Sequence, residues 1–143
     1  MSNRPAASDD ETLIRMRRQK RSGTKPEALV RRLVRDLGHR YRLNSSTLAG
    51  SPDISNKSRG WAIFVHGCYW HHHEGCSRVT VPKRNRDWWL AKFGRNQERD
   101  AAKIRALKEG GLRVMVIWEC ELREPETVRY RLAEWLGPGP SSE

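Results

Sequence analysis

Residues 61–65 read Trp-Ala-Ile-Phe-Val, and residues 113–118 read Arg-Val-Met-Val-Ile-Trp. Both runs have the length and the apolar content that are typical of buried strands. Between them, Asn85 is placed to cap a long helix that runs to about Glu109, where a Gly-Gly pair ends it. A strand, a helix and a second strand form a βαβ unit with two parallel strands. The sequence therefore predicts an α/β domain, a central sheet flanked by helices.

Other elements are predicted on either side of this unit. Thr24 can cap a helix that Gly38 ends, with Pro26 in the first turn and Glu27 three residues after the cap. A short strand is expected after Pro52-Asp53, followed by a hairpin turn at 56–60, and a final helix at 125–136. Residues 1–14 are expected to be a flexible arm, 15–136 one domain and 137–143 a tail. A short basic helix is expected at 12–20.

The charge of the chain favours a polyanionic partner. The formal net charge is +11, and eleven Lys and Arg residues lie between Arg15 and Arg42. Such density favours nucleic acid over an ordinary solvated surface. No stretch approaches the roughly 18 apolar residues of a membrane helix, and the N-terminus resembles no secretory signal. We therefore expect a cytosolic protein with no membrane partner, whose three cysteines are reduced.

Those cysteines predict a metal site. Cys68 and Cys76 flank a histidine triplet, and Cys120 follows the second apolar strand. Because parallel strands end at the same sheet edge, the topology brings Cys120 to Cys68. Three thiolates and one histidine would complete a tetrahedral structural zinc site. His73 is the preferred fourth ligand, but spacing alone does not exclude its two neighbours in the triplet.

Several acidic residues suggest phosphodiester chemistry. The Pro52-Asp53 pair before a short strand resembles the metal-binding aspartate of restriction-endonuclease-like nucleases, although no acidic-x-Lys signature follows on the next strand. Asp100 falls on the inward side of the long helix and needs a partner, which His66 or an arginine could supply. Glu27 suits either a capping box or catalysis. A carboxylate on Mg²⁺ and a histidine such as His71 could together activate water.

Taken together, several blocks resemble the very short patch repair (Vsr) mismatch endonucleases. Residues 64–73 read Phe-Val-His-Gly-Cys-Tyr-Trp-His-His-His, and 89–100 read Trp-Leu-Ala-Lys-Phe-Gly-Arg-Asn-Gln-Glu-Arg-Asp. Residues 116–123 read Val-Ile-Trp-Glu-Cys-Glu-Leu-Arg. The resemblance covers residues 15–136 and includes the Gly50-Ser-Pro-Asp53 turn. Agreement of several blocks in order is more specific than any single motif.

The resemblance implies a restriction-endonuclease-like fold and a strand-specific nick 5′ to the T of T:G mismatches left by deamination of 5-methylcytosine. It implies that Asp53 and the main-chain carbonyl of Val65 bind Mg²⁺. It also implies that His71 is the general base, assisted by Glu27, and that His66 pairs with Asp100. The implied ligands of a structural Zn²⁺ are Cys68, His73, Cys76 and Cys120.

The same resemblance assigns the contacts with DNA. Tyr69, Trp70 and Trp89 would wedge into the duplex beside the mismatch, where unstacking costs least. Base contacts are implied for Lys92, Asn96 and Arg123. This chain departs from the family in three places: Val65 replaces a frequent threonine, Tyr69 replaces a phenylalanine, and one extra residue precedes Cys76.

The implied setting is a bacterial cytoplasm, at the nucleoid, where a monomer would work with mismatch-repair proteins and a cognate cytosine methyltransferase. Two other functions fit parts of the pattern. One is a restriction-type endonuclease that cuts unmismatched DNA. The other is a non-catalytic, zinc-stabilised DNA-binding module, against which the full set of acidic and histidine residues argues.

Overall fold

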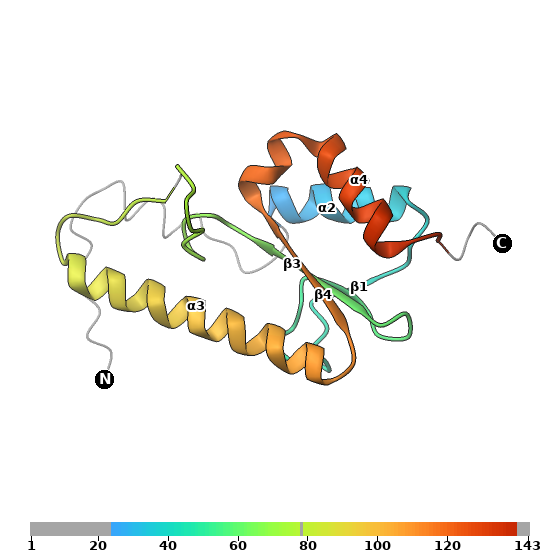
Figure 1. Ribbon diagram of the computed structural model, residues 1–143, viewed down its shortest axis with the longest axis horizontal. Helices are drawn as coiled ribbons and strands as arrows, with labels where there is room; N and C mark the ends of the chain where they lie inside the picture. The colour runs from blue at the N-terminus through green and yellow to red at the C-terminus, as the bar shows by residue number, and fades with distance from the viewer. Residues whose placement is uncertain (1–23, 78, 140–143) are drawn as a thin grey trace.

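The computed structural model describes residues 24–77 and 79–139 and confirms the α/β class (Figure 1). The expected arm at 1–14, the basic helix at 12–20 and the end of the tail lie outside these residues. Within them, no helix is both long and apolar enough to cross a membrane. The elements, in chain order, are α2 (Lys25–Asp36), β1 (Arg42–Leu43), β2 (Ile54–Asn56), β3 (Trp61–His66), α3 (Arg86–Glu109), β4 (Arg113–Trp118), the 3₁₀ helix η1 (Glu119–Arg123) and α4 (Pro125–Leu136).

The sheet is mixed and has the order β1-β2-β3-β4. β1 pairs with β2 and β2 with β3 in antiparallel register, and the predicted turn joins β2 to β3 through a 2.9 Å bond from the Gly60 N–H to the Asn56 carbonyl. β3 and β4 run in parallel, from Trp61↔Arg113 to His66↔Trp118. This pairing confirms the predicted βαβ unit. Both strands end at one edge of the sheet, which is where the chemistry gathers.

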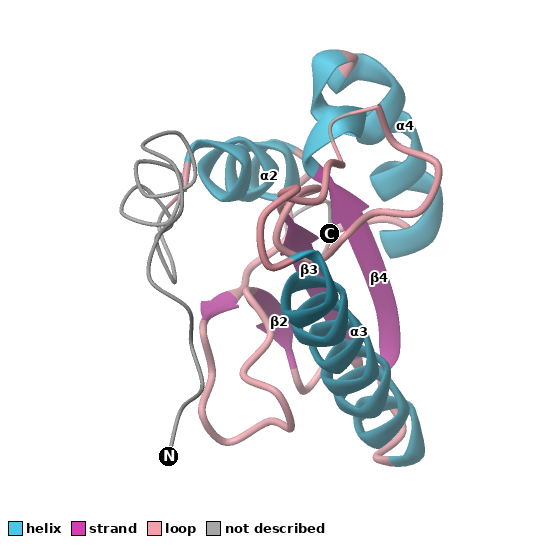
Figure 2. Cartoon of the chain, turned by 90° about the vertical axis from the view of Figure 1, so that its left-hand side faces the viewer, coloured by secondary structure: helices cyan, strands magenta, loops and turns pink. Residues whose placement is uncertain are grey.

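Helices cover both faces of the sheet (Figures 1 and 2). Trp61 and Ile63 of β3 face α2 and α4 in one apolar cluster, while Ala62 and Phe64 face Leu107 of α3 in the other. This alternation follows from the two-residue period of a strand. Full burial of each large apolar side chain stabilises the fold by roughly 1.5–3 kcal/mol. The long helix is therefore fixed against the strands that carry the site.

Thr24 and Asn85 were both predicted to cap a helix, and only Thr24 does so with its side chain. The Thr24 hydroxyl accepts a 3.3 Å hydrogen bond from the Glu27 N–H, as predicted. Gly38, with φ +87°, follows the end of α2, also as predicted. Asn85 stands at the start of α3, but its side chain makes no capping bond and its backbone is left-handed (φ 59°). The capping expectation is therefore wrong for Asn85, which is suited instead to the left-handed turn.

The start of the predicted tail is packed against the domain. The Gly137 carbonyl accepts a 3.0 Å hydrogen bond from the His39 imidazole, and Gly139 is buried. A Cβ added at Gly139 would lie 2.6 Å from the Gly38 carbonyl oxygen, so only glycine fits this approach. Residues 137–139 therefore pack against the domain, while the domain boundary at residue 136 stays a prediction.

Candidate active site and metal centre

The ends of β3 and β4 place two clusters of polar side chains at one edge of the sheet. The chain leaves β3 at His66, runs through an irregular segment and returns as α3, while β4 continues directly into η1. Cys68 follows the first strand and Cys120 the second, as the predicted topology requires. One cluster contains the three thiols, and the other contains Asp53, His66, His71 and Asp100.

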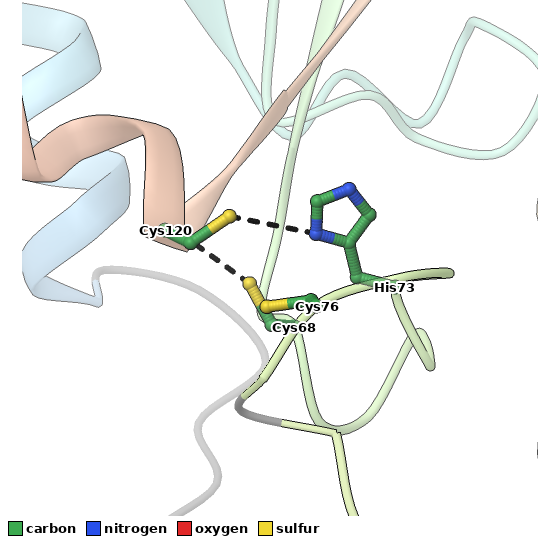
Figure 3. Close-up of side chains that lie close together, drawn as sticks. All are labelled: Cys68, His73, Cys76 and Cys120. Atoms are coloured by element: carbon green, nitrogen blue, oxygen red, sulfur yellow. Dashed lines mark hydrogen bonds between the residues drawn. The ribbon is translucent and has the colours of Figure 1, made fainter.

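The thiol cluster converges on one point (Figure 3). The Cys120 N–H lies 3.4 Å from the Cys68 sulfur, and the Cys120 sulfur lies 3.5 Å from Nδ1 of His73. One ligand atom from each of Cys68, His73, Cys76 and Cys120 lies within 4.8 Å of every other. Tetrahedral ligands about 2.0–2.3 Å from a zinc ion would be separated by roughly 3.5–3.8 Å. The four side chains can therefore hold a metal ion.

The three histidines of the triplet, residues 71–73, contact three different sets of side chains. His73 turns to the thiols and stacks on Trp118 with ring centres 4.0 Å apart, whereas His72 stacks on Phe93 at 4.3 Å. His71 binds Asp100. The alternatives that spacing left open are thus separated by geometry. Gly75, with φ +75°, accommodates the extra residue before Cys76.

Without a metal, the thiol cluster is electrostatically unfavourable for thiolates. Burial, together with the neighbouring cysteines, raises the pKa of the Cys68 thiol to about 12. A bound dication reverses this preference, because it stabilises the thiolate directly. The cluster is therefore suited to a cation rather than to nucleophilic chemistry by a free thiol.

In the second cluster, His71 and Asp100 form a charge-assisted pair. Nδ1 of His71 lies 2.7 Å from a carboxylate oxygen of Asp100, and both side chains are half-buried. Although burial alone would raise it, the pKa of Asp100 is held below its ordinary value by the His71 hydrogen bond and by nearby positive charge. Asp100 is therefore a carboxylate that fixes the His71 ring.

The expected pairing of His66 with Asp100 is wrong. Asp100 accepts its hydrogen bond from His71, and the His66 ring stacks on His71 with centres 3.8 Å apart and planes 3° apart. Burial, with His71 beside it, lowers the pKa of His66 to about 3, so His66 is neutral at physiological pH. Parallel stacked rings direct their nitrogen lone pairs alongside one another. That geometry does not suit shared coordination of one metal, although the atoms of His66, His71 and Asp100 lie close together.

Asp53 and Glu27 bring two carboxylates to the same region. A carboxylate oxygen of Asp53 accepts a 2.7 Å hydrogen bond from the Val65 N–H, which fixes it against β3. Burial raises the pKa of Asp53 to about 6, and the charge of Glu27 also raises it against the opposing effect of that hydrogen bond. Glu27 is itself buried, at 3% exposure. Two crowded carboxylates of this kind favour a bound cation.

Lys103 is a charged neighbour of the site that the sequence analysis missed. Its positive charge acts on Asp53, His66 and Asp100. It lies three residues after Asp100 and thus on the same side of α3. That spacing was the only signal in the sequence, and lysines on a basic helix are too common for it to stand out.

The residues expected to contact DNA have mixed environments. Tyr69 and Trp70 are half-buried in the loop after β3, with ring centres 5.1 Å apart. Asn96 donates a 3.3 Å hydrogen bond to the Trp70 carbonyl. Trp89 is only 3% exposed and packs between Trp88 and Phe93, so the structure places it in the core rather than at a DNA-facing surface. The Lys92 ammonium lies over the Trp88 ring, and Arg123 is exposed.

Similarity to known proteins agrees with this site. Residues 9–78 match the model of the family described as DNA mismatch endonuclease Vsr. The chain is 42% identical over 123 residues to the type II nicking enzyme V.XorIIP of Xanthomonas oryzae, covering 86% of this chain and 90% of the relative. It is 39% identical over 129 residues to the DNA mismatch endonuclease Vsr of Escherichia coli, covering 84% and 82%. The chain belongs to the Vsr family of DNA mismatch endonucleases.

A further Vsr-related protein supports the same assignment. The type II nicking enzyme V.NmeAIP of Neisseria meningitidis is 42% identical over 109 residues, covering 76% of this chain and 77% of the relative. Membership of the Vsr family makes this protein a DNA endonuclease and confirms the resemblance predicted from the sequence blocks. It also gives this basic chain, with a formal net charge of +11, its substrate class, which is DNA.

Proposed function

We propose that this endonuclease makes a single-strand nick 5′ to the T of a T:G mismatch, with Asp53 as its Mg²⁺ ligand and His71 as its general base. The observation that carries the catalytic part is the 2.7 Å pair of His71 and Asp100 beside the half-buried Asp53 carboxylate. A mismatch-specific nickase needs one water-activating group and one cation site. We assign these roles to His71 and Asp53, at the sheet edge where the loop with Tyr69 and Trp70 also lies.

The His71–Asp100 hydrogen bond defines the direction of proton transfer. Because a carboxylate accepts, Nδ1 of His71 carries the proton and Nε2 presents a lone pair. Nε2 can then take the proton of a water molecule as its oxygen attacks phosphorus and the bond to the leaving oxygen breaks. Neutral His66, stacked against His71, excludes water from one face of the ring and adds no competing charge.

The donor set at Asp53 fits magnesium. Mg²⁺ prefers oxygen ligands and usually takes one or two carboxylates together with waters and phosphate. Asp53 would supply a carboxylate and Val65 its main-chain carbonyl, with Glu27 close by to orient a water ligand. When bound, the ion would stabilise charge that develops on the phosphate. Burial, with a smaller contribution from the charge of Glu27, raises the pKa of Asp53, and a bound cation would offset both effects.

The soft donor set at the other cluster fits zinc, and we assign it a structural role. Three thiolates and one imidazole match a closed Cys₃His site. Zinc there would connect the loop after β3 to η1 and so position His71, which lies two residues before His73. The loop has little apolar core of its own, so metal binding would supply part of its folding free energy.

Tyr69 and Trp70 are the aromatic residues that we propose enter the duplex. They neighbour His71 in sequence, and the Asn96 bond to the Trp70 carbonyl holds the segment on α3. Unstacking a mismatched step costs less than unstacking a paired one, so a wedge at this position favours T:G over A:T. Lys92, Asn96 and Arg123 are the proposed base contacts, and Trp89 supports the wedge from the core.

Several broader features belong to the same proposal. The mixed sheet with helices on both faces is consistent with a restriction-endonuclease-like fold. We further propose that the protein works as a cytoplasmic monomer, with mismatch-repair proteins and a cytosine methyltransferase as its functional partners. The catalytic unit would span residues 15–139, with residues 1–14 as an arm.

A nicking assay tests the proposal. End-labelled duplexes with a T:G mismatch, with its A:T parent or with another mismatch are incubated with protein and Mg²⁺. We expect a single nick 5′ to the T of the T:G duplex and none in the parent. Equal cutting of the parent would favour a restriction-type activity, and tight binding without cutting would favour a DNA-binding module. Asp53→Ala should abolish nicking and keep most of the DNA affinity.

A further inference from the structure

We propose that Lys103 is a further catalytic residue, whose ammonium contacts the scissile phosphate and supplies the fixed positive charge of the site. This inference rests on the proposed nicking function and adds a group to it. Strand β3 (Trp61–His66), which leads into the site, contains no lysine or arginine. Lys103 would supply the positive charge from helix α3.

The first support is the position of Lys103 on α3. It follows Asp100 by one helical turn, and residues three apart share a helix face. Asp100 is fixed by its bond to His71, so this face of α3 is directed at the catalytic cluster. Lys103 is half-buried, unlike Lys108 further along the same helix, which is exposed. The stem of Lys103 is thus held at the site rather than in solvent.

The second support is the packing of Gly50 against the Lys103 stem. A Cβ added at Gly50 would lie 2.6–2.8 Å from the Cβ, Cγ and Cδ atoms of Lys103, far inside contact distance. Gly50 also has a left-handed backbone, with φ +72°. The turn before Asp53 therefore leaves space for this lysine stem. It is the inner carbons, rather than the flexible tip, that fill the space.

The third support is electrostatic. The charge of Lys103 acts on Asp53, His66 and Asp100, so the ammonium lies on the side of α3 that faces these three groups. Among residues 24–77 and 79–139, Lys103 forms no ion pair. An ammonium that lies near these side chains but pairs with none of them can donate hydrogen bonds to a phosphate oxygen.

The chemistry calls for such a group. A phosphodiester gains negative charge on its oxygens as water attacks, and a preorganised cation stabilises that charge. Lysine binds phosphate as a compact point charge with three N–H donors. His71 is the proposed base and its ring stacks on His66, so neither imidazole is placed to act as a permanent positive charge.

The experiment compares Lys103→Met, which keeps an unbranched stem against Gly50, with Lys103→Arg, which keeps the charge. Lys108→Met, at an exposed position of the same helix, is the matched control. Single-turnover nicking is measured on a T:G duplex with protein in excess and saturating Mg²⁺, and duplex affinity is measured separately. We expect Lys103→Met to slow nicking on the order of 100-fold, as loss of one charge-stabilising donor does. Lys103→Arg should stay within about tenfold of wild type, and Lys108→Met within about twofold.

A second readout distinguishes phosphate contact from structural support. One of the two phosphorothioate isomers at the scissile position should slow the wild-type protein, and this effect should shrink in Lys103→Met. The inference is wrong if Lys103→Met nicks as fast as Lys108→Met, or if it slows nicking without changing the sulfur effect. If Lys103→Met fails to fold, the same nicking measurements on Lys103→Gln and Lys103→Arg test whether the positive charge is needed. A wild-type protein that makes no nick at all would instead overturn the proposed function.

Discussion

At the scale of single residues, the assignment of one carboxylate determines how the site works. Asp100 could serve either of two stacked histidines, and its 2.7 Å hydrogen bond selects His71. That selection fixes the tautomer of His71 and leaves Nε2 available for a proton. His66 then has a supporting role, as a neutral ring that covers one face of the base.

Asp100→Asn should lower the single-turnover nicking rate by about 10²–10⁴-fold and change duplex affinity little. The amide would donate to Nδ1 of His71 and favour the tautomer whose Nε2 already carries a proton. Glu98→Gln, at an exposed position of the same helix, is the control. His71→Ala and the double variant His71→Ala/Asp100→Asn should be equally slow, because the two side chains act as one unit. Additive losses would contradict the pairing.

Asp53→Asn should stabilise the folded protein in magnesium-free buffer at pH 7.5. The folded-state pKa of about 6 exceeds the ordinary 3.8, so between these pH values the folded state binds more protons than the unfolded state. Stability therefore decreases as pH rises through this window, and the full penalty is present above pH 6. Asparagine can keep the Val65 bond and removes the charge, which should contribute about 1–3 kcal/mol.

Urea unfolding at two pH values checks this expectation. The gain from Asp53→Asn should be largest near pH 7.5 and disappear only below about pH 3, where the wild-type carboxyl is protonated in both the folded and the unfolded state. Added Mg²⁺ should stabilise the wild type and leave the variant unchanged. A variant that is less stable than wild type at pH 7.5 would show that Asp53 is not crowded by negative charge.

At the scale of elements, helix α3 is the part that assembles the site. Its buried face packs on β3 and β4, and the same helix presents Asp100 and Lys103 to the cluster. Asn96 and Gln97 donate to the carbonyls of Trp70 and His72, which holds the loop after β3 along the helix. A small shift of α3 would therefore displace the base, the loop and the lysine together.

Gly50→Ala should destabilise the protein more than Gly60→Ala, by at least about 1–2 kcal/mol. Both glycines have positive φ (+72° and +79°), so both substitutions carry a backbone cost of roughly 1–2 kcal/mol. Only at Gly50 does a Cβ collide with Lys103, while Gly60 has no heavy atom within 4 Å of that position. Overpacking supplies the difference.

Thermal melts of the two glycine variants measure this difference, and nicking assays show its consequence. Gly50→Ala should also slow nicking, because it displaces the Lys103 stem, whereas Gly60→Ala should not. Equal melting temperatures for both variants would mean that α3 moves to accommodate the added Cβ at Gly50 with no loss of stability.

At the scale of the whole molecule, the thiol cluster joins parts of the chain that the sheet alone leaves separate. Cys68 and Cys76 belong to the segment between β3 and α3, and Cys120 belongs to η1 after β4. A metal at this point would connect them across the sheet edge (Figure 3). The Glu121 side chain, which accepts from the Trp118 N–H and binds Arg131, continues the connection to α4.

Removal of the metal should loosen this edge and leave the sheet intact. The protein should contain one zinc per chain, and a chelator or Cys76→Ser should lower the melting temperature by about 10 °C or more. Hydrogen exchange should quicken at 67–77 and 119–123 and stay slow in β2 and β3. Ser77→Ala is the control, since Ser77 is exposed beside the cluster. Absence of bound zinc, or an unchanged melting temperature after chelation, would contradict the structural role.

The sequence by itself determined the βαβ unit, the meeting of the cysteines at one sheet edge and the family. Apolar runs at 61–65 and 113–118 reflect burial on two faces, and the position of Cys68 and Cys120 after parallel strands needs only topology. Each of these signals is local or follows from strand order. The helix start at Thr24 was equally local, because a cap is made by residues three apart.

Only the tertiary structure decided which partners these residues have. In the structure, Asp100 bonds to His71 rather than to His66, and Trp89 is buried. Lys103 of α3 packs against Gly50 in the turn before Asp53. Residues 137–139 also pack onto the domain through His39. Such pairings depend on how a helix is rotated and placed on the sheet, to within about an ångström. Periodicity gives the face of a helix but not that placement, which is set by close packing of the whole core.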